Sequence, residues 1–184
     1  SSKTTYEYKP AGGSYTTISD SNEASFDTTA LNDGDYIFRA NVSDGQANTD
    51  SVETGTLEID NTQPSASTNS PPSNARGTVN VAAWFTSSQD VDTKTYKYKV
   101  SGGSYTAISS PSSFDTTALS DGSVDFRLVA GDNESNTNSA TATITVDNTA
   151  PTVQGLDTSL TNSATPTVTV NVQESTTSLD TANT

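Results

Sequence analysis

Two Asp-Asn pairs, Asp60-Asn61 and Asp147-Asn148, are the residues whose type and spacing best suit a chemical role in this chain. Each pair follows an alternating stretch that predicts a strand, and each stands shortly before a proline that stiffens the next link. Carboxylate and amide oxygens are the ligands that Ca²⁺ prefers, and the ion takes about six to eight of them. The pairs therefore predict a calcium site at each of two joints.

Acidic residues of polar loops could complete such a site. We expect Asp44 and Asp132 to supply further ligands, because both stand in loops rich in Asp, Asn and Ser. The alternative is an Asx turn, in which the Asp side chain of the joint accepts a hydrogen bond from nearby backbone and caps the last strand. The sequence leaves both interpretations open.

Trp84 is the single tryptophan of the chain. Strict alternation with Val79, Val81, Ala83 and Phe85 on the inner face predicts that its ring points outward, where it could bind a glycan or a neighbouring subunit. A β-bulge just before it would instead turn the ring into the core. Both positions stay open.

Two N-x-S sequons begin at Asn41 and Asn133. Both are expected on or near surface loops, so both are candidate N-glycosylation sites.

Composition excludes several classes of function. The 184 residues include no His and no Cys, which rules out Ser-His-Asp triads, Cys-His dyads and most zinc sites, so we predict that the chain is not an enzyme. A formal net charge of −14 argues against binding to a nucleic-acid backbone. No apolar run approaches the length of a membrane span, so this segment is not expected to insert into a membrane.

An internal repeat organises the elements that must position these residues. The block 26–65 returns as the block 114–152, with matching residues displaced by 87 or 88 positions, and the Tyr-x-Tyr stretch at Tyr6 returns at Tyr96, displaced by 90. The repeat predicts an Ig-like domain lacking its first strands at 1–62, a complete domain at 63–149, and the opening strands of a further domain at 150–184. A cut in mid-domain has two explanations. Either the segment is a window of a longer array, or neighbouring copies complete one another by strand donation.

Short alternating runs with turn signals every 8–12 residues predict an all-β fold of tandem antiparallel β-sandwiches of immunoglobulin-like or fibronectin-like type. The pattern L-x-D-G-x-Y/V-x-F-R, a polar loop, and D-N-T-x-P resembles the Ig-like tandem repeats of large bacterial and archaeal cell-surface proteins and adhesins. Tyr36, a candidate tyrosine corner, is replaced by Val124 in the second block. The resemblance implies an extracellular or cell-surface location and calcium at domain boundaries.

The favoured function is therefore a structural extracellular repeat, part of a stalk or surface filament whose partners are further copies of itself. The alternative is an adhesin module that binds carbohydrate or a host surface.

Overall fold

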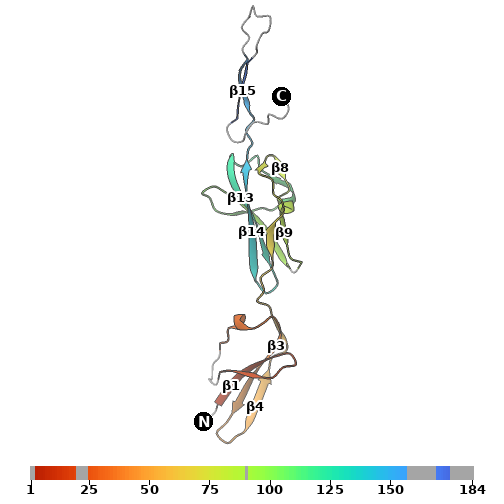
Figure 1. The fold of residues 1–184 in the computed structure, drawn as a ribbon. Coiled ribbons are helices and arrows are strands. Elements are labelled where there is room, and N and C mark those ends of the chain that lie inside the picture. The colour runs from red at the N-terminus through yellow and green to blue at the C-terminus, as the bar shows by residue number, and fades with distance from the viewer. Residues whose placement is uncertain (1–2, 20–24, 90, 157–168, 175–184) are drawn as a thin grey trace, which may run out of the picture. The chain divides into compact units, whose positions relative to one another are not determined.

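The structure is a computed structural model that describes residues 3–19, 25–89, 91–156 and 169–174. It is built almost wholly of strands, joined by turns and three short 3₁₀ helices, so the predicted all-β fold is confirmed (Figure 1). The chain forms two compact units, Ser1–Gln63 with Asp132–Asn136, and Pro64–Gly131 with Thr137–Thr184. Within the described part of the chain, no helix has the length and apolar character needed to span a membrane.

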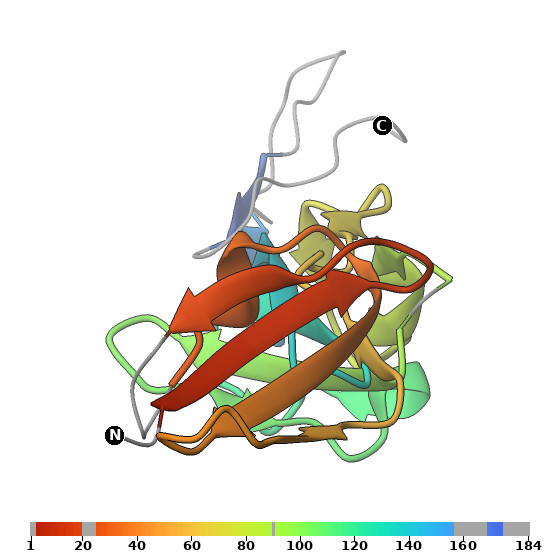
Figure 2. The ribbon, with the colours of Figure 1, turned by 90° about the horizontal axis from the view of Figure 1, so that it is seen from below.

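The first unit is a single antiparallel sheet in the order β2-β1-β3-β4, with β5 also paired to β3. Figure 2 shows strands of this sheet side by side as one layer, in red to orange. The elements are β1 (Lys3–Pro10), β2 (Thr16–Ser19), the 3₁₀ helix η1 (Thr28–Ala30), β3 (Gly34–Ser43), β4 (Thr49–Glu53) and β5 (Leu57–Ile59).

The second unit has the same central sheet plus a covering layer. Its main sheet has the order β11-β10-β13-β14-β7, and two small sheets pair β6 with β9 and β8 with β12. The elements are β6 (Ala66–Thr68), β7 (Asn74–Ala75), β8 (Thr78–Val79), η2 (Val81–Trp84), β9 (Phe85–Ser87), β10 (Thr93–Val100), β11 (Thr106–Ala107), η3 (Pro111–Ser113), β12 (Phe114–Asp115), β13 (Gly122–Gly131) and β14 (Thr137–Val146). A separate hairpin pairs β15 (Thr152–Leu156) with β16 (Val170–Gln173).

The core of the second unit follows from period-2 alternation along β13 and β14. On β13, Val124, Phe126 and Leu128 are buried, and on β14 the alternate residues Ala140, Ala142, Ile144 and Val146 are buried. The covering layer contributes Trp84, whose ring meets that of Phe126 edge-on with centroids 5.1 Å apart. The unit is therefore a closed two-layer sandwich.

The first unit has the same alternation without the burial. Tyr36 is its one buried hydrophobic side chain among the described residues. Val42 and Leu57 are 45% and 47% exposed, and Val52 is 69% exposed. The residues described for this unit supply one sheet and no second layer over that face, so its apolar side stays open.

The predicted strand through Val79–Phe85 is wrong in its middle. The side chain of Asn80 accepts a hydrogen bond from the Ala83 backbone at 3.2 Å and caps a 3₁₀ helix, Val81–Trp84. This turn exposes Ala83, which was predicted to be inward, and directs Trp84 into the core, where the residue is 8% exposed. The core position of Trp84 is confirmed, and the exposed ring that glycan binding by Trp84 requires is not present.

Candidate functional site: an acidic cluster and an open sheet face

The motif Asp60-Asn61-Thr62 ends the first unit, and the hydrogen bonds that Asn61 donates there tie the last strand to two turns. We call this set of hydrogen bonds the Asn staple. The Asn61 backbone N–H donates to the Asp33 carboxylate at 2.7 Å. The Asn61 side-chain amide donates to the carbonyls of Thr28 and Leu31, both at 3.0 Å. The last strand is thereby tied to the 3₁₀ turn and to the Asp-Gly turn that precedes β3.

The second unit repeats this staple at Asn148. Its backbone N–H donates to Asp121 at 2.6 Å, and its side-chain amide donates to the carbonyls of Thr116 at 2.9 Å and Leu119 at 3.1 Å. The amide nitrogens of both predicted calcium ligands, Asn61 and Asn148, are thus engaged with backbone.

The Asx turn that the sequence left open is present in both motifs. The Thr62 backbone N–H donates to Asp60 Oδ1 at 2.9 Å, and Thr149 does the same to Asp147 at 3.1 Å. One oxygen of each Asp is used in this turn.

The threonine hydroxyls of the two motifs also lower the pKa of two carboxylates. The hydroxyl of Thr62 donates to Asp33, and that of Thr149 donates to Asp121. These side-chain hydrogen bonds, followed by the Asn backbone donors, hold the pKa of Asp33 and of Asp121 below the usual value.

Two predicted ligands, Asp60 and Asp132, come together with a third acid, Glu134. Carboxylate oxygens of the three residues all lie within 4.8 Å of one another, inside the first compact unit. Among the described residues this is the one group of three or more Asp, Glu, His or Cys so arranged. Burial raises the pKa of Glu134, and the nearby charges of Asp132, Asp60 and Glu58 raise it further. The cluster concentrates negative charge that is not neutralised by a cationic side chain in any ion pair described there.

One oxygen of the cluster is buried without a hydrogen-bond donor. Asp132 Oδ1 accepts from the backbone of Glu134 at 3.1 Å and of Asn136 at 2.8 Å, whereas Oδ2 is buried and unpartnered in the structure. The Asn136 amide donates instead to the Asp60 carbonyl at 2.9 Å. An unpartnered buried carboxylate oxygen is costly unless a donor or a cation meets it.

In the corresponding loop of the first unit, both carboxylate oxygens of Asp44 accept hydrogen bonds. Asp44 Oδ1 accepts from the backbone of Gln46 at 2.8 Å and of Asn48 at 2.9 Å, as in the other loop. Here the Asn48 amide reaches Asp44 Oδ2 at 2.6 Å. Asp44 therefore keeps a local role, and Asp147 lies in no acidic group of three among the described residues.

Sequence reasoning missed Glu134. Its signal was present, since Asp132 and Glu134 stand two apart in one short loop. The loop geometry that aims both at Asp60 could not be read from the sequence.

The two sequons lie in different surroundings. Asn41 lies inside β3 rather than on a loop, because the strand continues to Ser43, and its amide donates to Glu7 at 2.6 Å. Asn133 is exposed at the tip of the β13–β14 hairpin. N-glycosylation at either residue stays a prediction.

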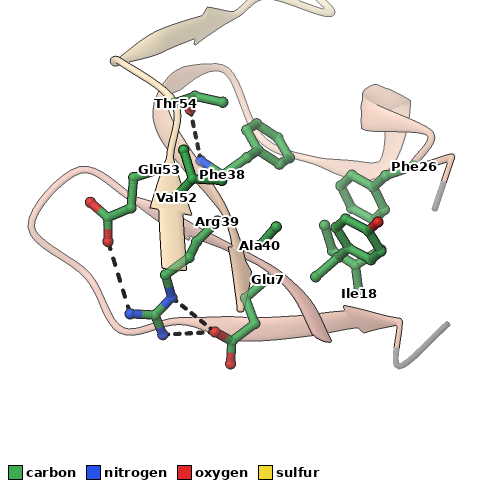
Figure 3. A pocket seen from close by; sticks show the side chains of 10 residues that line it. Glu7, Ile18, Phe26, Phe38, Arg39, Ala40, Val52, Glu53 and Thr54 are labelled. Carbon is green, nitrogen blue, oxygen red and sulfur yellow. Dashed lines mark hydrogen bonds and ion pairs between the residues drawn. The ribbon is translucent and has the colours of Figure 1, made fainter. Parts of the chain in front are cut away.

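The open apolar face of the first unit contains a hollow of about 280 Å³. Figure 3 shows the rings of Phe26 and Phe38 and the side chain of Ile18 among the residues that line this hollow, together with Arg39 and its ion-pair partners Glu7 and Glu53. The Arg39 guanidinium lies 2.7 Å from Glu7 and 3.9 Å from Glu53. One side of this sheet is thus polar and internally paired, and the other presents aromatic and aliphatic surface.

No protein-family model matches the chain, and no curated protein matches it. One solved structure to which it is similar is a tetra-tandem repeat in the extending region of a large adhesion protein. The match has a TM-score of 0.34 and 20% identity, and it covers 85% of this chain and 45% of that chain. A TM-score this low adds nothing to the fold assignment, which rests on the strands described above.

Proposed function

We propose that this chain is a structural repeat segment of an extracellular or cell-surface protein, in which Ig-like β-sandwich units follow one another in a stalk or filament. One observation carries the proposal: the strand plan and the Asn staple of the first unit recur in the second, at Asn61 and Asn148. Structural repeats that follow one another along a chain build extended proteins, in which each repeat contacts only its neighbours.

The role is mechanical. In the second unit β14 pairs antiparallel with β13 over the full register from Gly122↔Val146 to Gly131↔Thr137. The Asn148 staple then fixes the end of β14 to two backbone carbonyls. Tension on the chain end would have to break these hydrogen bonds together, because they lie in one continuous ladder and its anchor.

Immunogold electron microscopy tests location and form together. Antibodies raised against the recombinant chain are applied to intact and to permeabilised source cells. We expect label on intact cells, on the surface or along external filaments. Label confined to the interior of permeabilised cells contradicts the proposal.

We also propose that the acidic cluster binds Ca²⁺ through Asp60, Asp132 and Glu134. The unpartnered Asp132 oxygen and the raised pKa of Glu134 support it, because a divalent cation would meet both demands at once. The donors are all oxygen atoms, which suits Ca²⁺ better than a transition metal. When bound, the ion would join the 132–136 loop to Asp60, both of which belong to the first compact unit.

The two matched loops provide the control for a calcium test. Titration calorimetry with CaCl₂ should show one binding event per chain, and calcium should raise the melting temperature above that in EGTA. Asp132→Asn should abolish both effects, whereas Asp44→Asn, which alters the same loop position away from the cluster, should keep them. Equal loss in both variants, or no binding to the unmodified chain, contradicts the site. A magnesium titration in parallel shows whether the site prefers the larger ion.

A further inference from the structure

We infer that the outer face of the main sheet in the second unit binds the carboxylates of an acidic polysaccharide, through the side chains of Lys97, Tyr105 and Arg127. These three residues are called the donor cluster below. The inference goes beyond the proposed structural role, because it assigns a ligand to the side of one unit. It is carried by a comparison of matching positions in the two units, of which the first supplies carboxylates of its own.

In the first unit, two carboxylates neutralise the arginine of the matching face. Arg39 lies opposite Glu7 on β1 and opposite Glu53 on β4. Its guanidinium donates to Glu7 from Nε at 3.0 Å and from a terminal nitrogen at 2.7 Å, and it lies 3.9 Å from Glu53 (Figure 3). The ring of Tyr15 stacks on this guanidinium, and the Tyr15 hydroxyl donates to Glu53. The arginine and tyrosine donors of this face thus meet carboxylates within the unit.

The second unit keeps the arginine and the tyrosine but has neither carboxylate. Arg127 lies opposite Lys97 on β10 and opposite Thr141 on β14, the two registers at which the first unit has its glutamates. The Arg127 guanidinium carbon lies 4.1 Å from the centroid of the Tyr105 ring, so the stacked pair is retained. One glutamate is therefore replaced by a lysine and the other by a threonine.

This replacement leaves the donor cluster without an anion. Arg127 Nε donates to the Thr141 hydroxyl at 3.0 Å. Among the residues that the structure describes, no carboxylate forms an ion pair with Lys97 or Arg127, and none accepts a hydrogen bond from the Tyr105 hydroxyl. Two cations directly opposite one another on neighbouring strands destabilise a sheet. A carboxylate held between them would remove this repulsion and accept charge-assisted hydrogen bonds from both.

Basic residues are concentrated in the part of the chain that contains the cluster. Residues 64–131 include five basic and five acidic residues, whereas residues 1–63 include three basic and eleven acidic ones. The net charge of −14 therefore leaves a locally balanced segment in which the unpaired cations can attract an anion. A ligand that touches this face with a few carboxylates is favoured over a polyanion that follows the whole chain.

The surroundings of the cluster favour a sugar acid over an acidic protein. Thr95, two residues before Lys97 on the same face of β10, and Thr141 on β14 are both exposed, and their hydroxyls can bond with sugar hydroxyls. A stable protein partner needs about 800 Å² on each side, far more than three side chains offer. A uronic acid unit combines a carboxylate for the two cations with hydroxyls for the threonines.

A nuclear magnetic resonance titration with oligogalacturonate, in EGTA so that no calcium bridges the acids, tests the site. The amide signals of the donor cluster should shift, and those of the matching positions in the first unit should stay in place. Salt should weaken the binding, because exposed charges provide it. The fully methyl-esterified oligosaccharide has the same sugars without the charge and should not bind.

Lys97→Glu restores the residue type that the first unit has at this register. The new carboxylate should pair with Arg127, so the affinity for oligogalacturonate should fall about tenfold or more, while the melting temperature of the second unit should rise. Lys94→Glu makes the same change of charge on the same strand, but three residues away and therefore on the other face, and should leave the affinity unchanged. Fluorescence of Trp84 reports the unfolding of the second unit in both variants.

Four results would overturn the inference. Absence of binding to oligogalacturonate removes the ligand, and equal binding of the methyl ester removes the role of the carboxylate. Equal binding of a poly-glutamate peptide would assign the cluster to an acidic protein instead of a polysaccharide. A lower melting temperature of Lys97→Glu would show that Lys97 stabilises the sheet and does not repel Arg127. The immunogold test of the proposed function is independent of all four.

Discussion

Strands β3 and β13 have the same pattern of apolar and polar residues and very different burial. Tyr36 and Val124 begin both inward faces and are both buried, at 6% and 1% exposure. Further along, Val42 is 45% exposed where its counterpart Ala130 is 0% exposed. The difference comes from the covering layer, present over β13 and lacking over β3 in the described structure. An alternating strand thus specifies which face should be buried, and a second element must bury it.

The largest expected effect is a loss of stability when the two matched phenylalanines, Phe126 and Phe38, are each replaced by alanine. Phe126→Ala should destabilise the second unit by about 3–5 kcal/mol, because it leaves a cavity beside Trp84 in a closed core. Phe38→Ala should destabilise the first unit by less than half of that, because the ring already contacts water. Urea unfolding measures both, with Trp84 fluorescence for the second unit and circular dichroism for the first.

Equal losses of stability for the two variants at low protein concentration would contradict this difference in burial, since they would show that the face of β3 is covered in solution. Repeating the Phe38→Ala measurement at high concentration provides an internal control. A loss of stability that grows with protein concentration would show that self-association covers that face.

The inner faces of β13 and β14 could be predicted from the sequence because both strands alternate without interruption. The position of Trp84 could not, since a capping interaction by Asn80 replaces four residues of the expected strand, Val81–Trp84, with a 3₁₀ helix. The Asn80 side chain competes with strand pairing for a backbone N–H, and a period-2 pattern of apolar residues carries no information on that competition.

Part of the candidate site could likewise be predicted from the sequence, and part could not. Asp60 and Asp132 were predicted as ligands, and the structure brings them together. Asp44 and Asp132 are equivalent in sequence, yet Asn48 satisfies one carboxylate while Asn136 turns to the Asp60 carbonyl and leaves the other unpartnered. The choice of acceptor by one amide depends on tertiary contact, which no local pattern contains.

The staple provides the next comparison. Asn148→Ala should destabilise the second unit by about 1–3 kcal/mol, because it leaves the carbonyls of Thr116 and Leu119 without their donor. Asn61→Ala removes the same two bonds in the first unit, where an open sheet lets water replace them more readily. Thermal unfolding of both variants should show the larger shift for Asn148→Ala. A larger shift for Asn61→Ala would mean that the first unit depends more on its staple than on packing.

Acid should weaken the staples of both units. The folded-state pKa values of Asp33 and Asp121 are lowered, so their contribution to stability is fully present above the unfolded pKa and is lost as pH falls through the folded one. Unfolding followed by Trp84 fluorescence from pH 7 downward should show declining stability of the second unit below about pH 4. Asp121→Asn should flatten that decline, and an unchanged slope would assign the acid sensitivity to other carboxylates.

The smallest expected effect has the opposite sign and belongs to the acidic cluster. Burial and neighbouring acids raise the pKa of Glu134, so its charge destabilises the folded chain above that pKa, and the penalty disappears as pH falls below it. In EGTA at neutral pH, Glu134→Gln should raise the melting temperature slightly, and this gain should vanish in acid. Asp35→Asn, the same change of charge elsewhere in the first unit, should produce no such gain. With calcium present the sign should reverse, because the variant then lacks a ligand, so a gain that persists in calcium would separate Glu134 from the proposed site.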